Sequence, residues 1–281
     1  MKFTEAEAEI WIPDGADENT ALQRVTHMGI GAHPDDVEIM CLEGILACFG
    51  NAEKWFMATI VTDGATSPRD GIYANFTNDQ MKAIRRVEQK KAAVVGEYSA
   101  VAFLDYTGAA LANGAPGPKS DLISLLAASR PEIVYTHNLA DKHEHHVGVA
   151  MATIAAIRAL PAADRPSKLY GCEVWRDLDW LLDGDKLVFR LDQHESIGAS
   201  LLGVFDSQIE GGKRYDLATM GRRRAHATYH LPRSVDAASM INFGIDLTPL
   251  VVDEKLDPSV YIASFIERFS EDVTARIKKF T

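Results

Sequence analysis

The chain has 281 residues, of which 47% are hydrophobic and 25% charged, a composition typical of a globular protein with a large core. Its formal net charge of −11 argues against a nucleic-acid partner, because nucleic-acid binders concentrate positive charge. The three cysteines form no CxxC pair, and no apolar run is long enough to span a bilayer. We therefore expect a cytoplasmic protein with no membrane partner, and a homo-oligomer is one option.

The first half of the chain alternates between strand and helix patterns. Short apolar runs predict four strands, at residues 25–32, 54–62, 100–104 and 132–136. Helical patterns with normal start and stop signals predict four helices, at 36–49, 78–96, 120–129 and 149–160. This alternation predicts an α/β fold, a Rossmann-like three-layer sandwich with a mostly parallel central sheet.

The second half gives weaker patterns. Its predicted strands and helices lie at 168–174, 186–190, 197–209, 215–227, 238–243 and 259–280, the last of them an amphipathic closing helix. We expect residues 1–281 to form one domain, with a core at about 25–160 and a C-terminal elaboration at about 161–281. Residues 65–78 show little periodicity and predict a long surface loop, of the kind that can act as a lid.

Chemistry is concentrated where the first predicted strand ends. His33, Pro34, Asp35 and Asp36 follow this strand directly and open a helix. Zinc in a hydrolase is typically held by three histidine or carboxylate ligands, with the fourth position left to water. His33 and Asp36 are candidate ligands, and a third must come from elsewhere, although a capped helix start could also explain these residues.

A second polar cluster follows the predicted strand at 132–136. It carries four histidines, His137, His143, His145 and His146. Ligands of open parallel sheets bind outside the carboxyl ends of the strands, so the fold should bring this cluster to His33. Either His146 or His143 can then complete the metal site. His137 either lines the pocket or caps the loop.

These two clusters resemble the motifs of the LmbE-like, or PIG-L, family of zinc-dependent N-acetyl-sugar deacetylases. Residues 31–39 resemble the first motif, most closely that of the bacillithiol-type branch, and residues 141–146 resemble the second. Residues 62–64 and the helix around Arg85 fit the pattern between them, and residues 206–208 echo a Ser-Gln found later in many members.

The resemblance implies a site and a reaction. Zinc, or another divalent metal such as Fe²⁺, would be held by His33, Asp36 and His146. Asp35 would be the general base for the attacking water, and His143, as an imidazolium, would stabilise the oxyanion.

Three weaker substrate contacts complete these expectations. The resemblance implies Arg85 and Asp105 as substrate contacts, and the position of His137 near the strand end makes it the third candidate. The expected substrate is a small N-acyl amino sugar such as N-acetylglucosamine.

Two departures from the family pattern stand out. The family usually has Pro-Asp between the two histidines of the second motif, where this chain has Glu144 and His145. The missing aspartate would orient His143, so Glu144 or Asp141 must replace it or the role must move. We interpret His145 as an outer partner or a solvent-facing residue, with replacement of His146 as ligand as the alternative. Residues 42–44 replace a usual Gly-Gly, so packing under the site should differ.

Other functions remain open at this point. An amidase or deacylase could act on a non-sugar amide. The altered second motif also leaves room for a metal-binding protein without turnover. A nucleotide-binding protein is a further alternative because Gly29 and Gly31 follow a strand, but two carboxylates stand where a pyrophosphate would approach.

Overall fold

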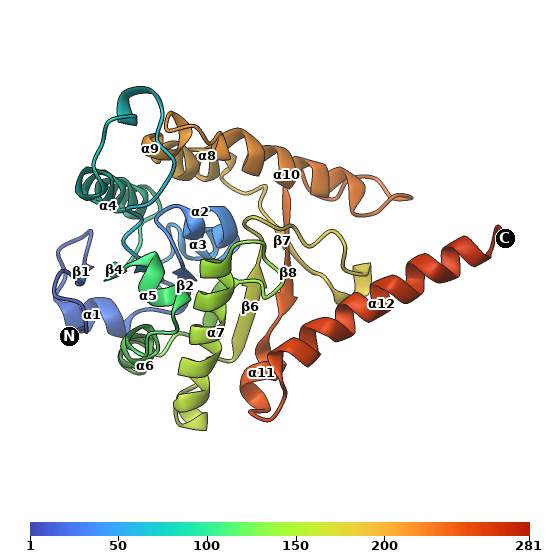
Figure 1. The fold of residues 1–281 in the computed structure, drawn as a ribbon, viewed down its shortest axis with the longest axis horizontal. Helices are drawn as coiled ribbons and strands as arrows, with labels where there is room; N and C mark the ends of the chain where they lie inside the picture. Colours follow the sequence, from blue (N-terminus) through green and yellow to red (C-terminus); the bar gives the residue numbers. More distant parts are fainter.

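The computed structural model describes all of residues 1–281 and is built around one eight-stranded sheet (Figure 1). The strands are β1 Glu9–Trp11, β2 His27–Gly31, β3 Phe56–Thr62, β4 Ala100–Tyr106, β5 Ile133–His137, β6 Lys168–Cys172, β7 Leu187–Arg190 and β8 Ile241–Asp246. Their order across the sheet is β1-β4-β3-β2-β5-β6-β8-β7.

The five central strands, from β4 to β6 in this order, are parallel. β1 pairs antiparallel with β4 at one edge, and β8 and β7 add two antiparallel strands at the other. The chain runs from β2 outward through β3 to β4 and then returns to the other side of β2 with β5. The strand order therefore reverses between β2 and β5, which is where open α/β sheets bind ligands.

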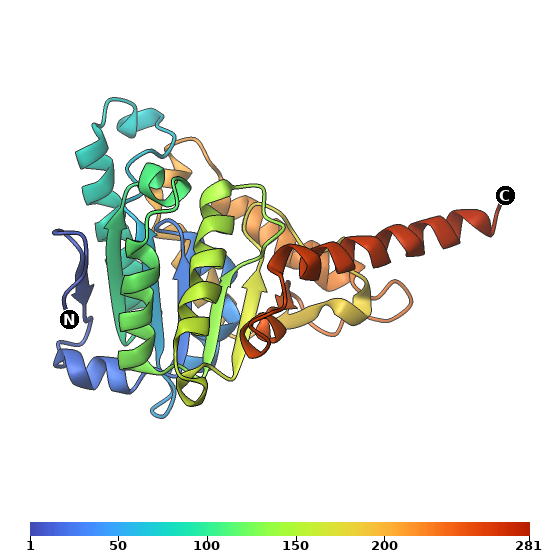
Figure 2. The same cartoon turned by 60° about the horizontal axis from the view of Figure 1, so that its bottom comes forward.

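Helices cover both faces of the sheet, as Figure 2 shows. One apolar cluster packs α6, α7 and α11 against one face, and a second packs α2, α3, α4 and α8 against the other. The predicted three-layer α/β fold is confirmed. The helices are α1 Glu18–Gln23, α2 Asp36–Met40, α3 Leu42–Cys48, α4 Asn78–Val95, α5 Gly108–Ala112, α6 Gly117–Ser129, α7 Glu144–Ala159, α8 Glu195–Gly203, α9 Asp206–Ile209, α10 Tyr215–Tyr229, α11 Thr248–Val252 and α12 Pro258–Lys278.

The predicted helix at 36–49 is interrupted at Cys41, so the structure has two helices there, α2 and α3. The break leaves carbonyl groups of α2 without helical partners. The fully buried Arg223 donates to the carbonyls of Glu38 and Ile39, and Asn242 also donates to Ile39. Because these donors come from far along the chain, local sequence patterns do not reveal the break. The predicted helix at 197–209 likewise divides into α8 and α9.

α7 begins five residues earlier than predicted, at Glu144. His143 is its N-cap residue, and its side chain accepts a hydrogen bond from the His145 backbone N–H. The early start puts His145 and His146 on the first turn of the helix instead of in a loop. Their side chains are therefore held by regular secondary structure.

The two ends of the chain differ in how they pack. At the N-terminus, β1 extends the sheet and α1 joins the apolar cluster beneath α6. At the C-terminus, α12 contacts the body through its first turns and then projects away from it, as both views show (Figures 1 and 2). None of the helices combines the length and apolar composition needed to cross a membrane.

Residues 42–44, which stand where the family usually has Gly-Gly, pack closely beneath the site. Leu42 is fully buried, and Glu43 accepts a hydrogen bond from the Tyr135 hydroxyl. A Cβ atom added at Gly44 would lie 2.6 Å from the Tyr135 ring, which is too close for two carbon atoms. Gly44 therefore allows α3 to lie directly against β5, next to the strand end that carries the site.

Gly44→Ala should lower the free energy of unfolding by about 1–3 kcal/mol, because the extra methyl group overpacks against Tyr135. Gly221→Ala is the matched control. Gly221 also lies inside a helix, but nothing is within 4 Å of its added Cβ. Alanine there should raise stability by up to about 1 kcal/mol through helix propensity. Urea unfolding of both variants measures the difference, and equal stabilities would contradict this account.

Candidate active site

The ends of β2 and β5 bring the two polar clusters together. His33 to Asp36 follow β2, and His143 to His146 follow β5 at the start of α7. The Ala32 backbone N–H donates to Nε2 of His137 at 2.9 Å and links the two strand ends directly. The expectation that the fold joins the two clusters at this edge is therefore met.

His33, Asp36 and His146 each turn one ligand atom toward a common point, and these atoms all lie within 4.8 Å of one another. Oδ2 of Asp36 is 3.1 Å from Nδ1 of His33 and 3.4 Å from Nε2 of His146. Ligand atoms about 2.0–2.1 Å from a tetrahedral zinc ion lie about 3.3 Å from one another, so these separations match. Both ring nitrogens of the fully buried His146 also lack a hydrogen-bond partner. The donor set thus fits a divalent cation.

The charge of this cluster also favours a cation. Burial alone would raise the pKa of Asp36, but His146 and His137 hold it well below its ordinary value. Burial alone would lower the pKa of His146, but Asp36 and Asp141 raise it to about 10. Two carboxylates therefore face one buried imidazole, and this excess negative charge stabilises a proton or a metal ion there.

Asp141 lies behind His146. Its Oδ1 is 3.4 Å from Nδ1 of His146 and accepts the His143 backbone N–H at 3.0 Å. Its Oδ2 accepts from the backbone of Trp175 at 3.0 Å. Asp141 therefore supports His146 and does not replace the aspartate that would orient the His143 ring. Glu144 is exposed on the first turn of α7 and does not replace it either.

The His143 ring is oriented by the backbone instead. Nδ1 accepts the His145 N–H at 3.2 Å, so the hydrogen of a neutral ring is on Nε2. Burial, helped by His146 and His145, lowers the pKa of His143 and favours this neutral form over the expected imidazolium. The residue can therefore offer an N–H to the cavity that it lines.

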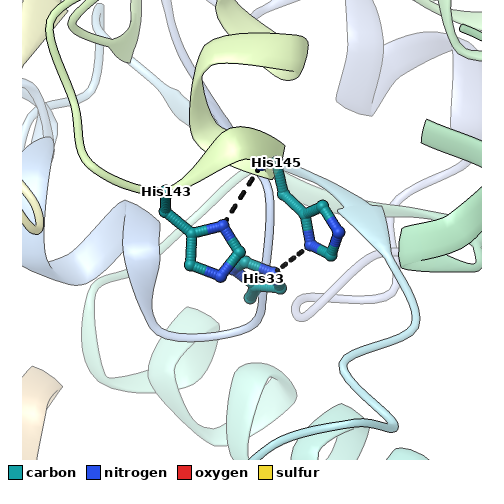
Figure 3. A group of neighbouring side chains, drawn as sticks. All are labelled: His33, His143 and His145. Atoms are coloured by element: carbon teal, nitrogen blue, oxygen red, sulfur yellow. Dashed lines mark hydrogen bonds between the residues drawn. The ribbon is translucent and has the colours of Figure 1, made fainter. Parts of the chain in front are cut away.

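His145 also faces the cavity and is not turned to solvent. Its Nδ1 lies 3.1 Å from Nε2 of His33, and Figure 3 shows these rings beside His143. A Cβ atom at Gly108 would come within 2.3 Å of the His145 ring, so the ring packs tightly on that glycine. The contact between His145 and His33 agrees with the expectation that His145 is an outer partner, because the other ring nitrogen of His33, Nδ1, faces Asp36.

One nitrogen each from His33, His143 and His145 forms a second group within 4.8 Å. This group is the poorer metal site, because the Nδ1 lone pair of His143 already accepts the amide of His145. His146, not His145, is the histidine that lies beside Asp36.

Asp35 is adjacent to Asp36 of the first group and is buried in a strained backbone conformation, with φ at 103°. Gln89 holds this conformation by accepting the Asp35 backbone N–H, and it donates in turn to the buried Glu38. Oδ1 of Asp35 is 3.3 Å from Nη2 of Arg85. Burial raises the pKa of Asp35 well above its ordinary value, although Arg85 opposes the shift.

Arg85 is buried and lines the cavity, so it is not an ordinary surface arginine. Its guanidinium donates to the carbonyls of Gly64 and Pro34 and so ties the loop after β3 to the loop after β2. Gly64 has φ at +68°, and a Cβ atom there would lie 2.9 Å from Pro34. The close approach of these two loops explains why glycine occupies this position.

Two of the expected substrate contacts do not line the cavity. The Asp105 carboxylate is bound by Lys82 at 2.6 Å and by Arg86 at 2.8 Å. His137 is fully buried and stacks on His146, with ring centroids 3.9 Å apart. His137 therefore supports the ring of His146 from behind, and Asp105 belongs to a separate ion-pair group.

The cavity itself has a volume of about 460 Å³. Its far wall comes from the second half of the chain, and sequence patterns did not assign most of these residues to the site. Glu88 fixes part of this wall by accepting the backbone N–H and the hydroxyl of Ser207, the residue beside Gln208. The loop at 65–78 contributes to the rim, and the Tyr73 hydroxyl ties it to Asp206. The wall residues are Trp175, Gln208, Lys213, Tyr215 and Arg222.

These observations define an α/β protein of Rossmann-like topology with a His/Asp group that could hold a metal ion at its switch point. Residues 28–157 match the model of the PIG-L family, described as GlcNAc-PI de-N-acetylase. The uncharacterized deacetylase YaiS of Escherichia coli K12 is 30% identical over 154 residues, which cover 53% of this chain and 76% of YaiS. The chain therefore belongs to the PIG-L family of deacetylases.

Solved structures share the fold at low sequence identity. The conserved protein TT1542 of Thermus thermophilus has a TM-score of 0.63 and 16% identity, covering 82% of this chain and 98% of its own. The N,N'-diacetylchitobiose deacetylase of Pyrococcus horikoshii has a TM-score of 0.62 and 14% identity, and the match covers 86% of this chain and 90% of the deacetylase. The hydratase GalB of Pseudomonas putida has a TM-score of 0.59 and 15% identity, and the match covers 79% of this chain and 95% of GalB. The same fold therefore carries deacetylases and a hydratase.

Asp141→Asn should weaken zinc binding about 10–100-fold, because the carboxylate behind a metal-binding histidine raises its basicity and fixes its ring. Competition with a chelating dye measures this affinity. Asp105→Asn is the matched control and should bind zinc like the parent protein, since Asp105 lies outside the cavity. If Asp141→Asn binds zinc with unchanged affinity, the Asp141 carboxylate does not support His146 as a zinc ligand.

Proposed function

We propose that this protein is a metal-dependent hydrolase that removes an N-acetyl, or related N-acyl, group from a small amino sugar. One observation carries the proposal. The buried carboxylate of Asp35 lines the same cavity as His33 and Asp36, and the buried ring of His146 completes their group beside Asp36. A metal-binding group beside an unligated carboxylate is the arrangement required for attack by water on an amide. Zinc is the expected ion, with Fe²⁺ as the alternative.

A divalent ion held by His33, Asp36 and His146 would acidify a water molecule and polarise the amide carbonyl. Asp35 accepts a proton from the attacking water. Its raised pKa matches this task, because a carboxylate with a higher pKa is a better base. Arg85 and the hydrogen bond to Gln89 keep the carboxylate in position.

His143 acts on the carbonyl oxygen. As water adds to the amide carbon, negative charge grows on this oxygen, and the Nε2–H of the neutral His143 ring donates a hydrogen bond to it. The C–N bond then breaks, and the departing nitrogen takes the proton that Asp35 accepted. The products are a carboxylic acid and a free amine, and the proton balance closes within the site.

The cavity supports a substrate of sugar size. Its volume of about 460 Å³ lies within the range of small-molecule sites. Trp175 and Tyr215 supply aromatic surface, and Ser67 and Gln208 supply hydrogen-bonding groups. Because three of these residues come from the second half of the chain, they also support the proposal that residues 1–281 act as one hydrolase domain.

Packing argues against the nucleotide-binding alternative. A Cβ atom at Gly29 would lie 2.8 Å from Phe56 and 2.9 Å from Cys41. A Cβ atom at Gly31 would lie 3.0 Å from Val37. These glycines therefore allow α2 and α3 to pack closely on β2, and their presence needs no bound pyrophosphate.

The direct test is a panel of N-acetyl amino sugars and non-sugar N-acetyl amides, incubated with metal-loaded and chelator-treated protein. Free amine and acetate are measured together. We expect both products, in equal amounts, from at least one amino sugar and only with metal. If only the non-sugar amides are hydrolysed, the substrate is a non-sugar amide and the amino-sugar assignment is wrong. Metal binding without any amide hydrolysis would overturn the enzyme assignment.

Asp35→Asn should keep the bound metal but lower amide hydrolysis about 100–10,000-fold, because the amide side chain cannot accept the proton of water. Metal content by elemental analysis and acetate release measure the two effects separately. Full activity in this variant would remove Asp35 from the mechanism.

His143→Ala should lower kcat about 100–1000-fold and leave the metal content unchanged, because it removes the donor to the developing oxyanion. His143→Gln retains an N–H donor and should recover part of the loss. Glu144→Gln, at the exposed neighbouring position, is the control and should have normal activity. Equal loss of metal and turnover in His143→Ala would instead make His143 a ligand.

A further inference from the structure

The second half of α12 carries apolar side chains that the rest of the chain leaves exposed. Ile262 and Phe265, on its first turns, are buried against the body. Every residue from 273 to 281 is exposed, and the helix projects freely in both views (Figures 1 and 2). The apolar residues of this half include Val273, 38% exposed, and Ile277, 58% exposed.

These side chains continue the buried face of the helix. Counting from Ile262, those up to Ile277 follow at intervals of four, three, four and four residues, which keeps them on one side of α12, and Phe280 follows just beyond the last helical residue, Lys278. The same stripe is therefore covered by the body at its start and uncovered afterwards. Its exposed members are Ile266, Phe269, Val273, Ile277 and Phe280. We call this set the α12 stripe.

An uncovered end of this kind needs a partner. From Val273 to its end the helix is exposed on all sides, and helical segments without tertiary packing are marginal in water. The apolar side chains of the stripe also expose a continuous surface, which is typical of an interaction site. Burial of the stripe would stabilise both the helix and the assembly that covers it.

The pattern of the stripe fits a second copy of itself. In an antiparallel pair with its two-fold axis at Val273, Phe269 faces Ile277 of the other copy and Ile266 faces Phe280. Every exposed apolar residue of the stripe then meets another one, as an isologous interface requires.

The charges beside the stripe are complementary in the same arrangement. Asp272 and Arg276 flank the stripe on one side and form an ion pair at 2.7 Å within the helix. In the antiparallel pair, this side of one helix meets the same side of the other. Each Asp272 then lies close to the other copy's Arg276. A parallel pair would set Asp272 beside the apolar Ile277 instead.

We propose that α12 forms a two-fold antiparallel helix pair with α12 of a second copy, centred on Val273, so that the protein is a homodimer. The interface lies on the projecting helix and uses no residue of the active-site cavity. The proposal therefore does not depend on the proposed function.

Sedimentation velocity of the full chain tests the dimer at concentrations on the order of micromolar, where stable interfaces are populated. Val273→Glu puts two like charges on the axis and should raise the dimer dissociation constant by about 30-fold or more. Val260→Glu is the matched control. Val260 is 62% exposed on the opposite side of the same helix, so this variant should remain dimeric. Circular dichroism confirms that both variants are folded.

Cysteine cross-linking tests the geometry, and the three native cysteines are buried and will not interfere. Under mild oxidation, Val273→Cys should form a disulfide with its own copy, because core Cα atoms of paired helices approach to bonding distance. Phe269→Cys should not link to itself but should link to Ile277→Cys in a mixture. Self-linking of Phe269→Cys would indicate a parallel pair. A monomeric parent protein would overturn the proposal. Binding of a monomer to anionic lipid vesicles through α12 would overturn it too, because the stripe would then face lipid and not a second copy.

Discussion

The Asp36 carboxylate is the contact on which the site depends. It lies buried among His33, His137 and His146, and its Oδ2 approaches all three rings within 3.1–3.5 Å. The sheet makes this possible, since β2 supplies the carboxylate and His33 while β5 supplies the other two rings. Because this one carboxylate contacts rings from both strand ends, the strand ends, the His/Asp group and the cavity form one unit.

The sequence predicted the central fold and the meeting of His33, Asp36 and His146 because both rest on local patterns. Apolar runs located the strands, and the rule that ligands bind at the carboxyl ends of parallel strands joined His33 to His146. The break at Cys41 was missed because the donors that stabilise it, Arg223 and Asn242, are distant in sequence. The far wall of the cavity was missed for a similar reason. Residues such as Lys213 have no motif, and only the packing of α9 and α10 brings them to the site.

The histidine at position 145 changes how the site is supported. The usual aspartate of the family would accept a hydrogen from the catalytic histidine, whereas here a backbone N–H donates to Nδ1 of His143. The ring is thereby fixed as a neutral donor, and His145 itself turns to His33. The change keeps an N–H in the cavity but removes the carboxylate that would favour an imidazolium. In the reaction proposed above, proton delivery to the leaving amine therefore falls to Asp35.

The central claim is that one divalent ion binds between His33, Asp36 and His146. Anomalous diffraction at the metal absorption edge, from crystals of zinc-loaded protein, tests it most directly. The account predicts a single strong peak about 2.0–2.2 Å from Nδ1 of His33, a carboxylate oxygen of Asp36 and Nε2 of His146. A peak held by the rings of His143 and His145, or no peak in this cavity, would contradict it.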